Sequence, residues 1–64
     1  MRLTDFWERM EAVFGTSYAH SWARDQVLVA LGGKTVEQAL REGEAAKRVW
    51  AAVVAETDVP ATLR

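Results

Sequence analysis

The sequence predicts an all-α fold, a compact bundle of three to four short helices that form a single domain over residues 1–64. Apolar residues recur at three- and four-residue steps along most of the chain, which is typical of amphipathic helices. Four glycines divide these periodic stretches. A 64-residue chain without cysteine needs large apolar side chains to build a core, so we expect Trp7, Trp22 and Trp50 to share one core.

The first helix is expected over residues 5–14. Thr4 is suited to be its N-cap, and Asp5 is favourable at the positive end of the helix dipole. Gly15 supplies the left-handed residue with which helices commonly end. One wide apolar face is formed by Leu3, Phe6, Trp7, Met10, Val13 and Phe14.

A second helix is expected over residues 16–31, before a Gly-Gly pair. Its apolar residues do not lie on a single face, which is typical of the central helix of a small bundle, and we favour this interpretation. The alternative is a bend near residues 24–26. One stripe holds Tyr18, Trp22 and Val29, and the nearly opposite side holds Val27 and Leu31.

Two further helices are expected after the glycine pair. Thr35 and Gln38 have capping-box spacing, because each can satisfy a backbone donor of the other, and they predict a short helix to about residue 42. The last helix is expected over residues 45–57, since Pro60 prevents its continuation. Its apolar face carries Ala46, Val49, Trp50, Val53 and Thr57, and beyond it Val59 and Leu63 are expected to fold back onto the bundle.

Composition argues against several classes of function. The net charge is −1, whereas nucleic-acid binders usually carry a basic excess. With no cysteine and one histidine, we expect no metal and no other cofactor. No apolar run approaches the roughly 20 residues of a membrane span, and residues 1–14 are charged and amphipathic, unlike a signal peptide. We therefore expect a cytoplasmic protein with no membrane contact and no small-molecule ligand.

Catalysis is not expected either. His20 is the chain's single histidine, and histidine is the most frequent general base in enzymes. On a helix, however, His20 and Asp25 fall on different faces, so no catalytic triad forms. We interpret His20 as a partly exposed side chain on a helix surface, and the protein as no enzyme.

The segment over residues 21–26 is the most interesting, because it places an indole, a guanidinium and a carboxylate within two helical turns. We favour a structural interpretation in which Asp25 faces inward and holds the helices in register, while Arg24 faces outward. The alternative is that Trp22, Arg24 and Asp25 form a patch that binds a protein partner, since Trp and Arg dominate binding energies at interfaces.

The last helix offers a second candidate surface for a protein partner or for a second copy of the chain. Small residues there would let another helix approach closely. The residues are Arg48, Ala51, Ala52 and Ala55.

We therefore expect a small non-enzymatic helical domain that binds another protein or forms a homodimer. The alternative is a nucleic-acid-binding or DNA-repair accessory protein, because residues 36–42 and 45–57 could form a helix-turn-helix. This alternative has weak support, since the last helix offers two basic residues and then mostly Ala and Val. It requires convergence on one face of Arg2, Arg9, Lys34, Lys47 and Arg48.

A family resemblance is carried by MRLTDFW (1–7), FG (14–15), SWARD (21–25), LGGKT (31–35) and DVP (58–60). In order and spacing these segments resemble an actinobacterial family of short proteins known as domain of unknown function 3046. The likeness spans nearly the whole chain. Members typically carry Asp-Pro after the glycine equivalent to Gly43, where this chain has Glu44 and Ala45, and this difference weakens the expected N-cap of the last helix.

The resemblance implies little about activity. The family has none assigned, so no functional residue carries over to this chain. Genes of the family often lie near the bacterial recombinase and its regulator, which implies at most a link to DNA repair.

Overall fold

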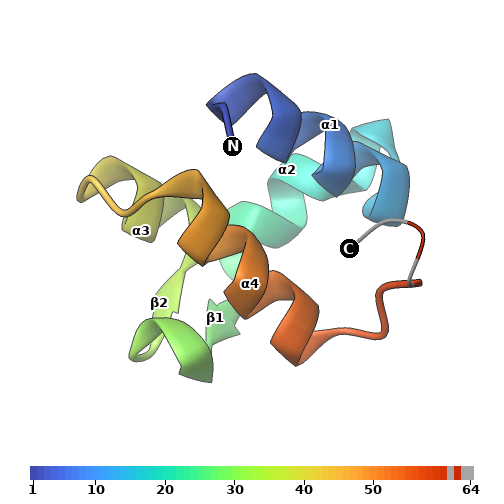
Figure 1. Cartoon of the computed structure of the whole chain (residues 1–64). Coiled ribbons are helices and arrows are strands. Elements are labelled where there is room, and N and C mark those ends of the chain that lie inside the picture. The colour runs from blue at the N-terminus through green and yellow to red at the C-terminus, as the bar shows by residue number, and fades with distance from the viewer. Residues whose placement is uncertain (61, 63–64) are drawn as a thin grey trace.

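The computed structural model describes residues 1–60 and 62 as a bundle of four α-helices with a small hairpin between the second and the third (Figure 1). This confirms the all-α prediction, with the hairpin as an addition. The helix α1 packs against α2 and α4, and α3 also packs against α2 and α4. The helices are α1 (Leu3–Phe14), α2 (Thr16–Asp25), α3 (Val36–Arg41) and α4 (Ala46–Glu56).

The first helix begins two residues earlier than expected. Its N-cap is Arg2 rather than Thr4, so the predicted cap is wrong. The reason is that Asp5 reaches back: its carboxylate accepts hydrogen bonds from the backbone N–H of Arg2 and from the Arg2 guanidinium, both at 3.3 Å. This pairing satisfies the backbone N–H of Arg2, so the helix begins directly after Arg2. Thr4 therefore already belongs to the first turn.

Gly15 is the only residue between α1 and α2, and it closes one helix while opening the next. Its φ is positive as expected, at 91°, but its ψ of 153° lies outside the left-handed helical region. This combination is open almost only to glycine. The conformation lets α2 turn back and pack along α1.

The expected helix over residues 16–31 ends at Asp25, so the central-helix interpretation is wrong. The chain does change course near residues 24–26, as in the alternative, but the helix ends there instead of bending. The chain continues as an antiparallel hairpin, in which Val27 pairs with Thr35 and Leu28 pairs with Lys34. Leu28 is buried while its two valine neighbours are exposed, which is the alternation of a strand rather than of a helix. The hairpin consists of β1 (Val27–Leu28), the 3₁₀ turn η1 (Val29–Leu31) and β2 (Lys34–Thr35).

The two later helices lie close to their expected positions. Thr35 caps α3 as predicted, because its hydroxyl accepts a hydrogen bond from the backbone N–H of Gln38 at 3.1 Å. The cap of α4 is Ala45, which has no side-chain acceptor, in line with the weak N-cap expected there. After α4, Val59 folds back into the core as expected, with 2% of its surface exposed; Leu63 lies outside the described residues.

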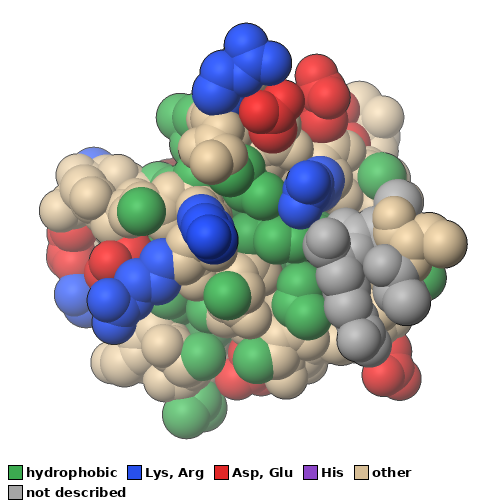
Figure 2. Space-filling model, in the orientation of Figure 1, with side chains coloured by type: hydrophobic (Ala, Val, Ile, Leu, Met, Phe, Trp, Pro, Cys, Tyr) green, Lys and Arg blue, Asp and Glu red, His purple; other side chains and the backbone are tan. Residues whose placement is uncertain are grey.

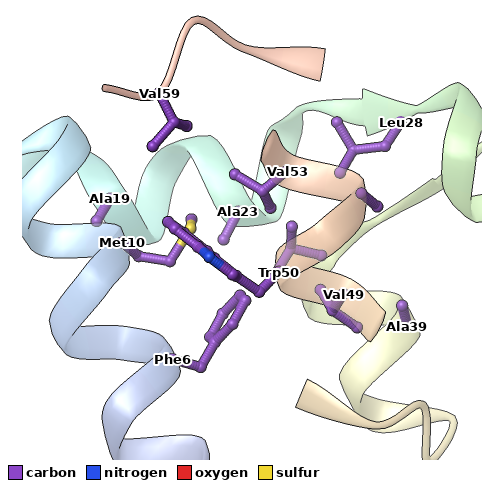
Figure 3. Close-up of a cluster of buried hydrophobic side chains, with 12 residues drawn as sticks. Phe6, Met10, Ala19, Ala23, Leu28, Ala39, Val49, Trp50, Val53 and Val59 are labelled. Atoms are coloured by element: carbon purple, nitrogen blue, oxygen red, sulfur yellow. The ribbon is translucent and has the colours of Figure 1, made fainter. Parts of the chain in front are cut away.

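Trp50 lies in the middle of the core, between side chains of α1 and its own helix (Figure 3). Its ring meets the edge of Phe6 at 6.1 Å, and 5% of Trp50 is exposed. Trp7 and Trp22 are half-buried and pack against the same cluster. The three tryptophans therefore contribute to one core, but only Trp50 is at its centre. The remaining buried residues are Met10, Ala19, Ala23, Leu28, Val36, Ala39, Val49, Ala52, Val53 and Val59.

Candidate functional site

Trp22, the aromatic residue of the predicted α2 patch, lies against the end of α1. Its ring stacks on that of Phe14, with centroids 4.5 Å apart and planes 22° apart. Phe14 in turn meets the edge of the exposed Tyr18 at 6.4 Å. One face of Trp22 is thus used to join α1 to α2, and the indole is half-buried rather than free for a partner.

Arg24 and Asp25 both face solvent, with 63% and 68% of their side chains exposed. The expectation that Asp25 faces inward is wrong, because α2 ends at this residue and no further turn of helix carries it under a neighbour. The Arg24 Nε donates to Asp25 Oδ1 at 3.2 Å. This hydrogen bond raises the pKa of Arg24 above its usual value. The pair neutralises its own charge at the end of the helix.

The second predicted surface, on α4, is exposed only in part. Arg48 is exposed on α4 and lies 3.6 Å from the carboxylate of Glu44, on a different helix from Trp22 and the Arg24–Asp25 pair. Ala52 is buried in the core, so it does not lie on the outer face of α4, as was expected. Ala51 and Ala55 are exposed.

A different surface brings distant residues together between α1 and α4. It is a shallow hollow of about 490 Å³, lined by Met1, Arg9, Lys47, Trp50 and Ala51, which we call the α1/α4 groove. Its centre is apolar and its two sides are cationic. Figure 2 shows basic side chains on either side of a hydrophobic strip where α1 and α4 meet. The guanidinium of Arg9 lies 6.0 Å from the centre of the Trp50 ring, within the range of a cation–π contact.

Lys47 differs from most cations of the chain in its surroundings. It is exposed, and within the described part of the chain no carboxylate lies within ion-pair distance of it. Most other Lys and Arg residues there are paired with an acid one to eight residues away. These pairs are Arg2–Asp5, Arg24–Asp25, Lys34–Glu42, Arg41–Glu37 and Arg48–Glu44.

His20 lies on the surface of α2, as expected, with 58% of its side chain exposed. Its imidazole stacks on the Trp7 indole at 4.4 Å, and its Nε2 lies 3.3 Å from a carboxylate oxygen of Glu11. Both contacts join α2 to α1. Over residues 1–60 and 62, no group of three or more His, Cys, Asp and Glu side chains gathers as a metal site would require.

A scan against protein families gives a match over residues 1–62 to a family described as Protein of unknown function (DUF3046). The chain belongs to this family. The match agrees with the resemblance found in the sequence, and it covers the whole of the helical bundle. Searches of curated proteins and of solved structures give no match to the DUF3046 chain. No helix in the described part of it is long and apolar enough to cross a lipid bilayer.

Sequence reasoning did not find the α1/α4 groove of this DUF3046 protein. Arg9 and Lys47 were noted as cations and Trp50 as a core residue, but nothing placed them on one surface. A weak signal was present. Arg9 directly precedes Met10 of one apolar stripe, and Lys47 lies one turn before Trp50 of the other. Cations at the borders of two apolar stripes can meet wherever two helices pack along those stripes.

Proposed function

We propose that this protein is a small non-enzymatic helical domain that binds another protein through the α1/α4 groove. The observation that carries the proposal is the composition of the groove. The exposed Ala51 and the small exposed part of the Trp50 indole form its apolar centre, and a guanidinium and an ammonium lie beside it. Interface hot spots are enriched in Arg, and they lie where apolar contact is surrounded by polar groups. The proposal includes a cytoplasmic location, because a chain without cysteine needs no oxidising compartment to form disulfides.

The α2 patch of Trp22, Arg24 and Asp25 is a weaker candidate for the same role. Trp22 uses one face on Phe14, and the Arg24–Asp25 pair offers a partner little net charge. A partner would have to separate that pair before using either group. In the α1/α4 groove, a partner could bind Lys47 without first separating an ion pair within the described residues.

The experiment is site-specific photo-crosslinking in the native host. A photo-crosslinking amino acid replaces Ala51 in the groove, and in matched controls it replaces Arg24 in the α2 patch or Val29 in η1. All three positions are exposed, so each substitution leaves the core intact. We expect one discrete protein adduct from position 51 alone.

Other results would contradict the proposal. A discrete adduct from position 24 alone would move the binding surface to the α2 patch. Equal adducts from all three positions, or none from position 51, would remove the groove as a protein-binding surface.

Nucleic-acid binding is the alternative, and one observation favours it: Arg9 and Lys47 line the same surface although they lie on different helices. The other three cations that this hypothesis needs, Arg2, Lys34 and Arg48, are each paired with a carboxylate elsewhere. Binding to a labelled DNA duplex at low salt, weakened by Lys47→Gln, is the result expected of this alternative.

A further inference from the structure

We propose that the occupant of the α1/α4 groove is an amphipathic helix of a partner protein, with an apolar side chain over Trp50 and Ala51 and an acidic side chain beside Lys47. This inference rests on the proposed function and specifies the partner's chemistry. It combines three properties of the groove: its apolar centre, the charge at its sides, and the helical backbone on which it is built.

The apolar centre of the groove is rigid and lies close to the backbone of α4. Trp50 is held in the core by Phe6 and is 95% buried, so its ring does not rearrange when something packs on the exposed remainder. Ala51 follows it on α4 and is exposed with only a methyl group. A partner's Leu or Met side chain can therefore approach the helix closely there. Met1, which is 44% exposed, adds an adaptable apolar contact at the edge.

The charge at the sides selects an acidic partner. Lys47 is exposed and within the described residues has no carboxylate at ion-pair distance, whereas its neighbour Arg48 lies 3.6 Å from Glu44. Lys47 also lies in the first turn of α4, where the helix dipole adds positive potential. Arg9 supplies a second positive group across the Trp50 ring. A carboxylate on the partner would complement this field, and a cation would be repelled.

The same charges argue against a second copy of the chain. In a two-fold symmetric dimer through this groove, each surface meets its own equivalent. Lys47 and Arg9 would then face Lys47 and Arg9 of the other copy. Like charges placed against each other disfavour such an interface, so we expect a different protein.

The backbone at the groove favours a helix over an extended peptide. Both walls are α-helices, whose backbone hydrogen bonds are satisfied internally. A partner strand needs an exposed sheet edge to pair with, and β1 and β2 are two residues each. A helix needs only side-chain contacts at positions i, i+3, i+4 and i+7. The contact between two packed helices provides that kind of surface.

The test uses three synthetic peptides of equal length. The first is amphipathic, with Leu at i, i+4 and i+7 and Glu beside them. The second replaces each Glu by Gln, and the third keeps the composition of the first but scrambles it so that no apolar face forms. Binding to the full chain is measured by fluorescence anisotropy, and amide chemical shifts map the contact surface. A labelled DNA duplex is included as a fourth probe.

We expect the acidic amphipathic peptide to bind most tightly and to shift the amides of residues 9 and 47–51. The Gln peptide should bind about tenfold more weakly, and the scrambled peptide should not bind. Lys47→Glu should weaken the acidic peptide by about tenfold or more, whereas the matched control Arg48→Glu should leave it unchanged. Both side chains are exposed, so both variants keep the fold, as far-UV circular dichroism will verify.

Each contrary result has a distinct meaning. Equal binding of the Glu and Gln peptides would overturn the acidic partner. Failure of all three peptides, with a protein adduct still forming at position 51, would overturn the helical partner and leave the proposed function standing. Binding of the duplex alone would overturn both in favour of nucleic acid.

Discussion

Trp50 contributes to both the core and the surface of this protein. Most of its indole fills the space between α1 and α4, and the remainder forms the floor of the α1/α4 groove. Its Nε1 is buried, and no described residue accepts a hydrogen bond from it. The contribution of Trp50 to stability therefore comes from apolar packing rather than from hydrogen bonding.

Replacing Trp50 by alanine should destabilise the fold by about 3–5 kcal/mol, the usual cost of truncating a buried tryptophan. That loss is comparable to the whole stability of a small domain, so the variant should be largely unfolded at 25 °C. Urea denaturation followed by circular dichroism measures the change. Tyr18→Ala, which truncates an exposed aromatic residue, is the control and should melt close to the wild type. A near-native melting temperature for Trp50→Ala would contradict the position of the core described above.

Asp25→Ala should leave the melting temperature nearly unchanged. The carboxylate is 68% exposed, and among the ion pairs and hydrogen bonds of the described residues it contacts only the neighbouring Arg24; exposed pairs contribute little to stability. Arg24→Ala should behave in the same way. Thermal melts of the two variants test this, and a clear drop for Asp25→Ala alone would restore the inward-facing role that the sequence suggested.

Among the elements, the helices followed from the sequence and the hairpin did not. The periodicity of the first, third and fourth segments is long enough to identify each as a helix, and the Thr35 cap fixes where α3 begins. Over residues 27–29, exposure alternates between neighbours as in a strand, but the run is too short to be told from a helix by pattern alone. The pairing of Val27 with Thr35 makes this segment a strand rather than a helix. Such a contact across a turn is not visible in local periodicity.

Gly15→Ala should cost about 1–3 kcal/mol, because φ 91° with ψ 153° is a conformation that residues with a Cβ avoid. Apart from its chain neighbours, a Cβ at this position would meet no atom within 4 Å, so the loss is due to backbone strain rather than to a clash with a packed neighbour. The matched control is Gly32→Asn. Gly32 has φ 73° and ψ 27°, within the left-handed region that asparagine adopts readily. Chemical denaturation of both variants should show a large loss at Gly15 and a small one at Gly32; equal losses would contradict this account.

Ala45→Asp should stabilise the protein by about 1 kcal/mol. Ala45 is the N-cap of α4 and provides no side-chain acceptor for the first turn, whereas an aspartate there would accept a backbone hydrogen bond and favour the helix dipole. Denaturation midpoints measure the gain. The control is Ala55→Asp near the end of the same helix, where the dipole is unfavourable. A gain from Ala55→Asp as large as that from Ala45→Asp would show that added charge, and not capping, is responsible.

At the scale of the whole molecule, the groove depends on how α1 and α4 pack, and this was not available from the sequence. Arg9 and Lys47 belong to segments at opposite ends of the chain. Local patterns identify which face of each helix is apolar, but they do not say which other helix covers it. The residues of the predicted α2 patch, by contrast, all come from one segment of the chain. Whether they are exposed depends on where that one helix ends.

The stability of the molecule should fall in acid. The pKa of Glu42 is held below its usual value first by its hydrogen bond from Lys34, and that of Asp5 by hydrogen bonds from Arg2. Groups with a lowered folded-state pKa stabilise the fold above their unfolded pKa of about 4, and this contribution is lost as the pH falls through the folded value. Wild type should therefore lose more of its unfolding free energy between about pH 6 and pH 3 than Lys34→Gln does.

The control for this measurement is Lys47→Gln, which removes a lysine that has no carboxylate partner in the described chain. It should keep the acid sensitivity of the wild type. Urea denaturation at a series of pH values compares the three proteins. If Lys34→Gln and Lys47→Gln shift the acid dependence equally, net charge rather than the Lys34–Glu42 pair governs it.

The contact between Phe6 and Trp50 also constrains the order in which parts of the protein can fold. It joins the first helix to the last, so a long loop must close before the two rings meet. The helices α1 and α2 can form early from local contacts, but Phe6 lacks its ring contact with Trp50 until α4 has formed. During synthesis, this part of the core therefore stays incomplete until the ribosome has made Trp50.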